Sequence, residues 1–203
     1  MSVFNKVTQT VMYKNLKLTL FFLLVLFLNH IVQVKAQQTY AVAANPEMKV
    51  SGTSSLHDWD MISEEATGTA SLRLSAGKVT AIQGVKVSMK VKSLKSGKNQ
   101  MDKNAYEALK EKEYPEITFS MLEAHQDGGN DWKVSGRLQI AGVTKTVHFM
   151  IKIAPEGESI ALTGFTDIKL TDFNVAPPTA VFGTIKTGDE MTININMKLN
   201  SIN

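Results

Sequence analysis

The feature of this sequence that most constrains its fold is an alternation of apolar and polar residues that recurs through most of the chain. It is cleanest near the C-terminus, where the apolar residues from Met191 to Leu199 alternate with Thr, Asn and Lys. Successive side chains of a β-strand point to opposite faces, so this pattern predicts a strand with one apolar face. Regular or looser forms of it occur in about eight segments: residues 48–53, 67–74, 79–91, 117–123, 132–140, 147–153, 160–170 and 191–199. Ile82 is the exception, an apolar residue at a polar position.

Short turn signals separate these segments. They are found at residues 76–77, 127–130, 141–142, 156–157 and 188–189. Such short connections join antiparallel neighbours, whereas a parallel pair needs a crossover of a dozen or more residues. The sequence therefore predicts an antiparallel meander.

One segment has the spacing of a helix. Over residues 102–112 the apolar side chains recur on one side, Asp102 or Asn104 offers a side chain to cap the start, and Tyr114-Pro115 ends the pattern. We predict one short helix at about 102–112. With so little helix to cover them, the strands must bury their apolar faces against one another, in a barrel or a sandwich. We favour an all-β, eight-stranded antiparallel barrel, since closure removes exposed strand edges.

The first 36 residues have the layout of a secretory signal peptide. Lys14 and Lys17 precede an apolar run over residues 18–28, and a small-residue exit follows at 34–36. As a helix this run spans ~17 Å, which is short of a hydrocarbon core of ~30 Å. We expect cleavage near Ala36 and no stable membrane anchor. Because Met12 begins a leader of ordinary length, the start is either Met1 or Met12.

Removal of residues 1–36 leaves 203 − 36 = 167 residues, a common size for one domain, so we expect a single domain over 37–203. The leader contains four lysines and no acid, so the rest has 22 − 4 = 18 basic and 19 acidic residues. This near-neutral balance, with scattered lysines, predicts no nucleic-acid partner. The chain has no cysteine, which excludes disulfides and thiolate metal sites and favours a bacterial periplasm or extracellular space. The sequence does not decide between a monomer and a homodimer.

The predicted inner face has almost no charge and is rich in methionine. Such a lining suits a hydrocarbon chain, whereas a sugar or nucleotide needs converging hydrogen-bonding groups. Gly52, Gly68, Gly136 and Gly164 share this face, where a solid core calls for large side chains. These glycines either leave room for a cavity or let the strands bend at barrel corners. On the pattern alone, a solid core and a ligand cavity both remain open.

Several segments carry a family resemblance that spans essentially the whole mature chain. They are residues 50–59 with the sequence Leu56-His57-Asp58-Trp59, then 93–103, 108–119, 136–145, 171–173 and 188–189. In this order and spacing they resemble the YceI-like family of lipid- and polyisoprenoid-binding proteins. The chain departs from the family pattern at Asn174, where glycine is expected, and over residues 176–180.

The resemblance implies an extended lipocalin-like barrel of eight antiparallel strands, export to the periplasm, and a polyisoprenoid or similar apolar lipid as the bound partner. We therefore expect a non-enzymatic, exported protein that carries or sequesters a long apolar ligand, with neither cofactor nor metal ion. We expect the ligand to contact the apolar barrel lining at Val87, Met89, Phe119, Met121, Leu138, Phe149, Ile151, Ile193, Ile195 and Met197.

The adjacent pair His57-Asp58 is the one feature that invites a catalytic interpretation, since a carboxylate beside an imidazole can form a general base. Neighbours on a strand point to opposite faces, and the chain has no nucleophile-elbow motif. The mature part has only His57, His125 and His148, without metal-binding spacing. We expect a structural or rim role for His57.

Two alternatives to the lipid carrier remain open. One is a solid-cored barrel that acts through its surface as a binding or structural module of the cell envelope, and the other is an enzyme that acts on a bound lipid through a group such as His57.

Overall fold

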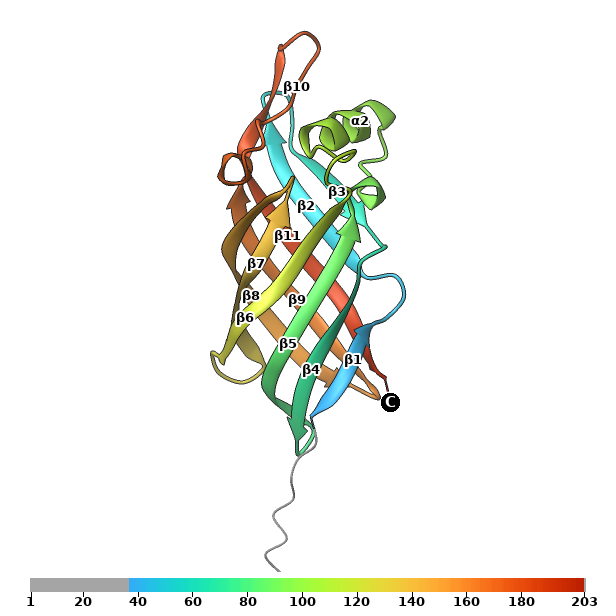
Figure 1. The fold of residues 1–203 in the computed structure, drawn as a ribbon, viewed down its shortest axis with the longest axis vertical. Helices are drawn as coiled ribbons and strands as arrows, with labels where there is room; N and C mark the ends of the chain where they lie inside the picture. The colour runs from blue at the N-terminus through green and yellow to red at the C-terminus, as the bar shows by residue number, and fades with distance from the viewer. Residues whose placement is uncertain (1–36, 203) are drawn as a thin grey trace, which may run out of the picture. The chain divides into compact units, whose positions relative to one another are not determined.

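The computed structural model describes residues 37–202, which form an antiparallel barrel with helical segments at one end (Figure 1). The predicted signal peptide, residues 1–36, lies outside the described residues. The strands are β1 (Gln38–Val42), β2 (Glu47–Ser54), β3 (Trp59–Ser63), β4 (Thr67–Ser75), β5 (Lys78–Lys90), β6 (Glu116–Gln126), β7 (Asp131–Ile140), β8 (Val143–Glu156), β9 (Ser159–Lys169), β10 (Thr179–Ala180) and β11 (Ile185–Ser201).

Eight of these strands close into a ring. Neighbours pair in the order β1-β4-β5-β6-β7-β8-β9-β11, and β11 pairs with β1 to complete the circle. The closing register places Tyr40 opposite Ser201 and Val42 opposite Leu199. The predicted eight-stranded antiparallel barrel is therefore confirmed, although β1, β3 and the short β10 fall outside the segments in which we predicted strands.

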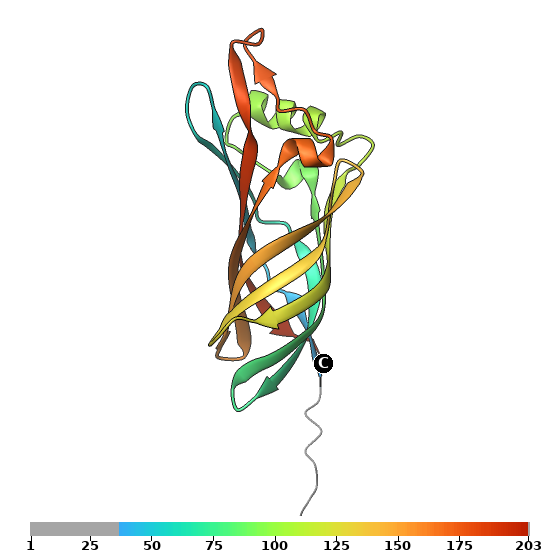
Figure 2. The same cartoon turned by 90° about the vertical axis from the view of Figure 1, so that its left-hand side faces the viewer.

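The longest strand, β11, pairs with different partners along its length. Its C-terminal end pairs with β1, whereas its middle part pairs with β2, from Thr187 opposite Ser54 to Asn196 opposite Glu47. Strand β3 pairs with β2 and has its outer edge covered by Lys95, which exchanges two backbone hydrogen bonds with Ile62. At its start β11 also pairs with β10, which forms a hairpin that projects beyond the barrel (Figure 2).

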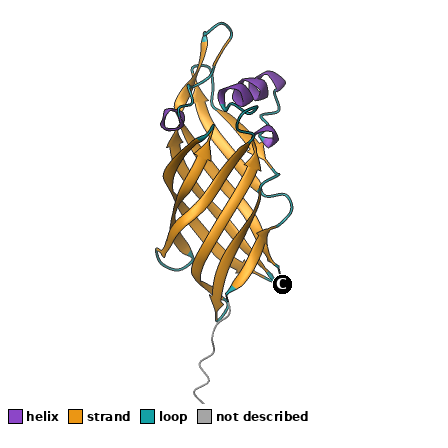
Figure 3. Ribbon diagram, viewed as in Figure 1, coloured by secondary structure: helices purple, strands orange, loops and turns teal. Residues whose placement is uncertain are grey.

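The helical segments described by the structure gather at the same end as this hairpin (Figure 3). They are the 3₁₀ turns η1 (Val91–Ser93) and η2 (Leu170–Phe173) and the helix α2 (Asn99–Ala108). The helix was expected at about 102–112, but it begins and ends earlier. Lys98 occupies the N-cap without a side-chain bond, and Lys110 adopts a left-handed φ of 53° just past the end. The two residues expected to cap it make other hydrogen bonds. The Asp102 carboxylate accepts from Ser96, and the Asn104 side chain accepts from Gln100.

β-bulges account for two departures from the predicted pattern. The β4–β5 register shifts between Ser71 and Leu72, so Ile82 lies in the core in spite of its polar position in the alternation. The Gly188-Asp189 pair, which we predicted to be a turn, lies inside β11 where its register against β2 shifts between Thr187 and Met191. An extra residue at a bulge reverses the facing of the residues after it, which a strict two-residue period cannot anticipate.

Large side chains of neighbouring residues occupy the space beside three of the inner-face glycines. A Cβ on Gly136 would overlap the Phe119 ring, one on Gly52 would lie 2.5 Å from the Trp59 ring, and one on Gly164 would overlap Ile151 Cδ1. Their missing side chains are therefore replaced by side chains from adjacent strands. Neither the empty volume nor the strand bending that we considered is needed to explain these three positions.

The bulge in β11 is tied to η2 by a carboxylate. Asp189 accepts hydrogen bonds from the backbone nitrogen of Thr171 at 2.9 Å and from its hydroxyl at 2.7 Å. These hydrogen bonds favour the charged form and lower the pKa of Asp189 from its ordinary value.

Gly136 is expected to tolerate no side chain. The variant Gly136→Ala should lower the free energy of unfolding by about 1–3 kcal/mol, because its Cβ overlaps the Phe119 ring and the Ser120 carbonyl oxygen. Urea unfolding followed by tryptophan fluorescence measures this change. Gly84→Ala is the matched control, since nothing lies within 4 Å of a Cβ at that strand position. Equal stability of the two variants would contradict the close packing of Phe119 against Gly136.

The lowered pKa of Asp189 predicts a pH-dependent contribution to stability. A carboxyl whose pKa is lower in the folded state stabilises the protein above the unfolded pKa, and this contribution is lost as the pH falls through the folded pKa. The stability of the wild-type protein relative to Asp189→Asn should therefore be constant above about pH 5 and decline below about pH 4. Thermal unfolding across this range measures it. In a Thr171→Val background the decline should be smaller, because one of the two donors is gone.

Candidate ligand cavity

The barrel encloses a cavity of about 520 Å³. Its wall is built from the inward-facing residues of the strands and is almost entirely apolar. Eight of its 45 lining residues are polar, and Lys98 is the one Lys, Arg, Asp or Glu among them. The cavity volume lies within the range of about 300–1,000 Å³ typical of small-molecule sites. This space can hold an apolar molecule, and its wall has few groups to orient a polar one.

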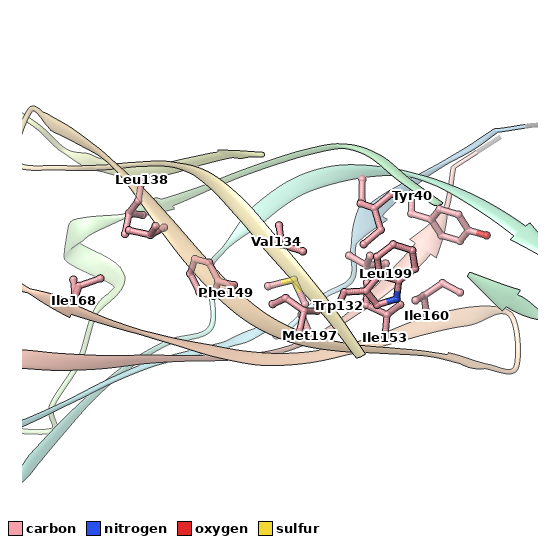
Figure 4. Close-up of a cluster of buried hydrophobic side chains, with 14 of the residues drawn as sticks. Tyr40, Trp132, Val134, Leu138, Phe149, Ile153, Ile160, Ile168, Met197 and Leu199 are labelled. Atoms are coloured by element: carbon pink, nitrogen blue, oxygen red, sulfur yellow. The ribbon is translucent and has the colours of Figure 1, made fainter. Parts of the chain in front are cut away.

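A plug of buried side chains closes the cavity floor near the end of the barrel that carries the chain's C-terminus. Tyr40, Trp132 and Ile160, each at most 3% exposed, pack there with Ile153 and Leu199 (Figure 4). Ile153 and Leu199 also line the cavity, whereas Tyr40, Trp132 and Ile160 lie outside its lining. Farther along the barrel Phe119 packs edge-on against Phe149, with ring centroids 5.4 Å apart. The cavity therefore has a closed end.

The opposite end is the mouth, where the polar lining residues collect. Ser54 is the last residue of β2, and His57 lies in the β2–β3 loop. Lys98, Gln100 and Asn104 come from α2 and the segment before it, and Thr179 and Thr187 come from β10 and β11. Thr69 on β4 is the eighth. Because several of these residues are exposed, the cavity reaches the surface here. A molecule with an apolar chain and one polar end fits this distribution with its polar end at the mouth.

Helix α2 forms one side of the mouth and is held by its own polar contacts. Met101, Ala105 and Ala108 face the cavity from the helix. Asp102 is buried, and its Oδ1 accepts hydrogen bonds from the backbone nitrogen of Ser96 at 2.8 Å and from its hydroxyl at 2.6 Å.

Tyr106 makes the second attachment of the helix. Its hydroxyl bonds to the backbone oxygen of Leu94 at 2.7 Å and accepts a hydrogen bond from Lys95 Nζ at 2.8 Å. The bond to Tyr106 raises the pKa of Lys95. The helix is thereby fixed to the segment that also covers the edge of β3.

Nine of the ten residues predicted to contact a ligand lie in the cavity lining. They are Val87, Met89, Phe119, Leu138, Phe149, Ile151, Ile193, Ile195 and Met197. The tenth, Met121, is packed against the core but is not part of the lining. Met121 stands opposite Gly136, and the Phe119 ring occupies the space above that glycine. That these residues bind a ligand remains a prediction.

A comparison with known families identifies the kind of protein. A family model described as the YceI-like domain matches residues 33–199. The chain belongs to the YceI-like family. None of the curated proteins compared with the chain matches it in sequence.

Solved structures agree with a YceI-like barrel. The Burkholderia cenocepacia protein BcnA has a TM-score of 0.60 at 22% identity, with 74% of this chain and 95% of that chain covered. A Campylobacter jejuni YceI protein has a TM-score of 0.58 at 20% identity, covering 69% of this chain and 82% of its own. A polyisoprenoid-binding domain from Saccharophagus degradans has a TM-score of 0.61 at 13% identity, with 81% and 99% covered. At these identities the likeness establishes the shared fold.

Several cavity residues of this YceI-like barrel were not among the predicted ligand contacts. Trp59 and Met61 come from β3, which we did not predict, and Trp59 donates from Nε1 to the Thr53 carbonyl at 3.0 Å. Leu56 lies in the β2–β3 loop, and Ile185 is the first residue of β11. Strand β3 is only five residues long, too short for a persuasive alternation, and loop residues have no period at all.

The structure does not pair His57 with the neighbouring carboxylate. His57 lies in the mouth lining and is exposed, and its Nδ1 contacts the backbone oxygen of Asp58 at 2.7 Å instead of the Asp58 carboxylate. Among residues 37–202 no group of three or more His, Cys, Asp or Glu could hold a metal ion.

None of the helices in residues 37–202 is long and apolar enough to cross a membrane. Asn174, where we expected glycine, has a left-handed φ of 55° at the end of η2.

The attachment of α2 through Asp102 can be tested directly. Asp102→Ala should lower the free energy of unfolding by about 1–3 kcal/mol, because the backbone nitrogen of Ser96 loses its acceptor in a half-buried site. It should also speed amide hydrogen exchange selectively in residues 96–109. Asp102→Asn keeps an oxygen at the same place and serves as the control. Unchanged exchange of α2 in the alanine variant would show that the helix is held by other contacts.

Proposed function

We propose that this YceI-like protein is an exported carrier or scavenger that holds one long apolar lipid, of the polyisoprenoid or fatty-acid type, inside its barrel. The observation that carries the proposal is the apolar cavity with a plugged floor and a polar mouth. Export rests on the signal-peptide pattern of residues 1–36, with the bacterial periplasm or the extracellular space as destination. The polyisoprenoid-binding domain from Saccharophagus degradans shares the fold, which adds support for the lipid class.

Hydrophobic burial supplies the affinity in this proposal. Each methylene transferred from water to the cavity contributes about 0.8 kcal/mol. Association costs on the order of 4–15 kcal/mol, so a chain of several isoprene units offsets this cost while a short ligand does not. The nine predicted contacts in the lining would surround the chain, and the polar groups at the mouth would meet its hydroxyl, carboxylate or phosphate. Methionines such as Met89 and Met197 adapt to ligands of varied shape.

The lining offers no reason to assign a reaction to the bound lipid. Its polar residues are confined to the mouth except for Thr69, and no nucleophile is paired with a base among them. A binding protein therefore accounts for the described residues with fewer assumptions than an enzyme. A solid-cored module, the other alternative raised by the sequence, does not explain the cavity.

Native mass spectrometry of the mature protein, followed by organic extraction, tests the proposal. The wild-type protein purified from the periplasm should carry about one lipid per chain. Ile195→Trp, which places a large ring in the cavity, should lose most of this lipid, because the ring takes up space that the lipid would fill, and it should remain folded, because the cavity accommodates the ring. Met150→Trp makes the same substitution type on the outer wall, where Met150 is 39% exposed, and should keep the lipid. Equal lipid content in the two variants would place the lipid outside the barrel.

A further inference from the structure

The tip of the β10–β11 hairpin exposes apolar side chains in a strained backbone. Val181 is 62% exposed and Phe182 is fully exposed. Both adopt left-handed φ values, 50° and 53°, which L-residues avoid and which a β-branched residue such as Val avoids most strongly. Turns of this kind normally use Asn and Gly at these positions. The sequence thus places two apolar residues where the fold alone would favour polar or small ones.

A second loop, attached to the base of this hairpin, presents another exposed apolar side chain. Leu56 in the β2–β3 loop is 65% exposed. Its loop is fastened to β11, because the Ser55 nitrogen donates to the Lys186 carbonyl at 2.9 Å and the Lys186 nitrogen donates to the Ser55 hydroxyl at 3.1 Å. Ser54 Oγ holds the loop in shape by accepting from the Leu56 and His57 nitrogens. The exposure of Leu56 is therefore a fixed feature of the mouth.

These side chains are continuous with the cavity mouth. Leu56 lines the cavity itself, and so do Thr179 and Ala180, which lead into the hairpin tip. Figures 1 and 2 show the hairpin projecting at the mouth end, opposite the plugged floor. These apolar side chains therefore border one side of the mouth through which a lipid would enter or leave.

We propose that the rim formed by Leu56, Val181 and Phe182 docks the protein on the surface of a lipid bilayer, so that cargo passes between the membrane and the cavity without crossing water. This deepens the proposed function and rests on it for the transfer of cargo. The chain carries no charged side chain over residues 50–56 and 173–185, which suits insertion into an apolar medium.

The size of the rim favours a membrane over a protein partner. An aromatic side chain buries about 150–250 Å² at most, so three side chains fall short of the roughly 800 Å² per partner of a stable protein interface. Insertion of a few apolar side chains into a bilayer needs no complementary surface. The resulting attachment is weak and reversible, as a carrier that must leave the membrane requires.

Sedimentation of the mature protein with phosphatidylcholine vesicles tests the docking. The wild-type protein should bind. The double variant Val181→Asn with Phe182→Gly should bind the vesicles with an affinity lower by about tenfold or more, because each lost side chain removes apolar area. This variant adopts left-handed φ readily, so its Tm should equal or exceed that of the wild type and its loss of binding cannot be ascribed to unfolding. Ile202→Asp alters an exposed apolar residue at the plugged end and should leave binding unchanged.

Three results would overturn the docking proposal. One is a wild-type protein that ignores the vesicles, which would leave a protein partner as the occupant of the rim. The second is binding that persists in the hairpin variant. The third is binding that disappears with added salt, since Leu56, Val181 and Phe182 are uncharged. Polyisoprenol supplied in detergent should load the wild type and the hairpin variant equally, whereas loading from vesicles should be slower in the variant. A wild-type protein that binds vesicles but takes up no polyisoprenol from detergent would support docking and contradict the proposed cargo.

Discussion

Every part of this structure depends on hiding one apolar face of its strands from water. A single sheet with that face exposed would be insoluble, and one short helix cannot cover it, so the sheet curls until the face encloses itself. Enclosure leaves an interior whose chemistry is determined by the strands alone. Because the inward positions carry apolar side chains almost without exception, the same property that builds the barrel also makes its interior suited to a hydrocarbon chain.

The two ends of the barrel differ, because buried side chains close one end of the cavity and the other end opens at the mouth. Tyr40, Trp132 and Ile160 fill one end with bulky side chains. The other end is bordered by α2, by loops and by strand ends such as Thr179 of β10 and Thr187 of β11, where polar side chains reach the surface. A container of this design orients its contents, since only one end of the cavity offers hydrogen bonds.

The sequence predicted the barrel and nine residues of the cavity wall because both follow from one period. Wherever the period holds, as in Phe149 and Ile151 of β8 or Ile193 and Ile195 of β11, facing could be inferred correctly. The two-residue period failed at the bulges. It assigned Ile82 to the outer face, and Gly188-Asp189, predicted to be a turn, lies within strand β11. It also failed for Trp59, whose strand is short, and for Met121, which packs against the core yet is kept from the cavity. Short strands and register shifts are decided by partners distant in sequence, which local pattern does not record.

The closing of the ring has a consequence for the order of folding. Strand β1 near the start of the described chain pairs with the last strand, and Tyr40 meets Ser201. A chain that emerges from its N-terminus onward therefore cannot close the barrel until its final residues are available. Contacts between residues so far apart also make folding slow, because a long loop must be ordered before they form. The chain thus stays open for as long as its last strand is held back, which is compatible with the export proposed above.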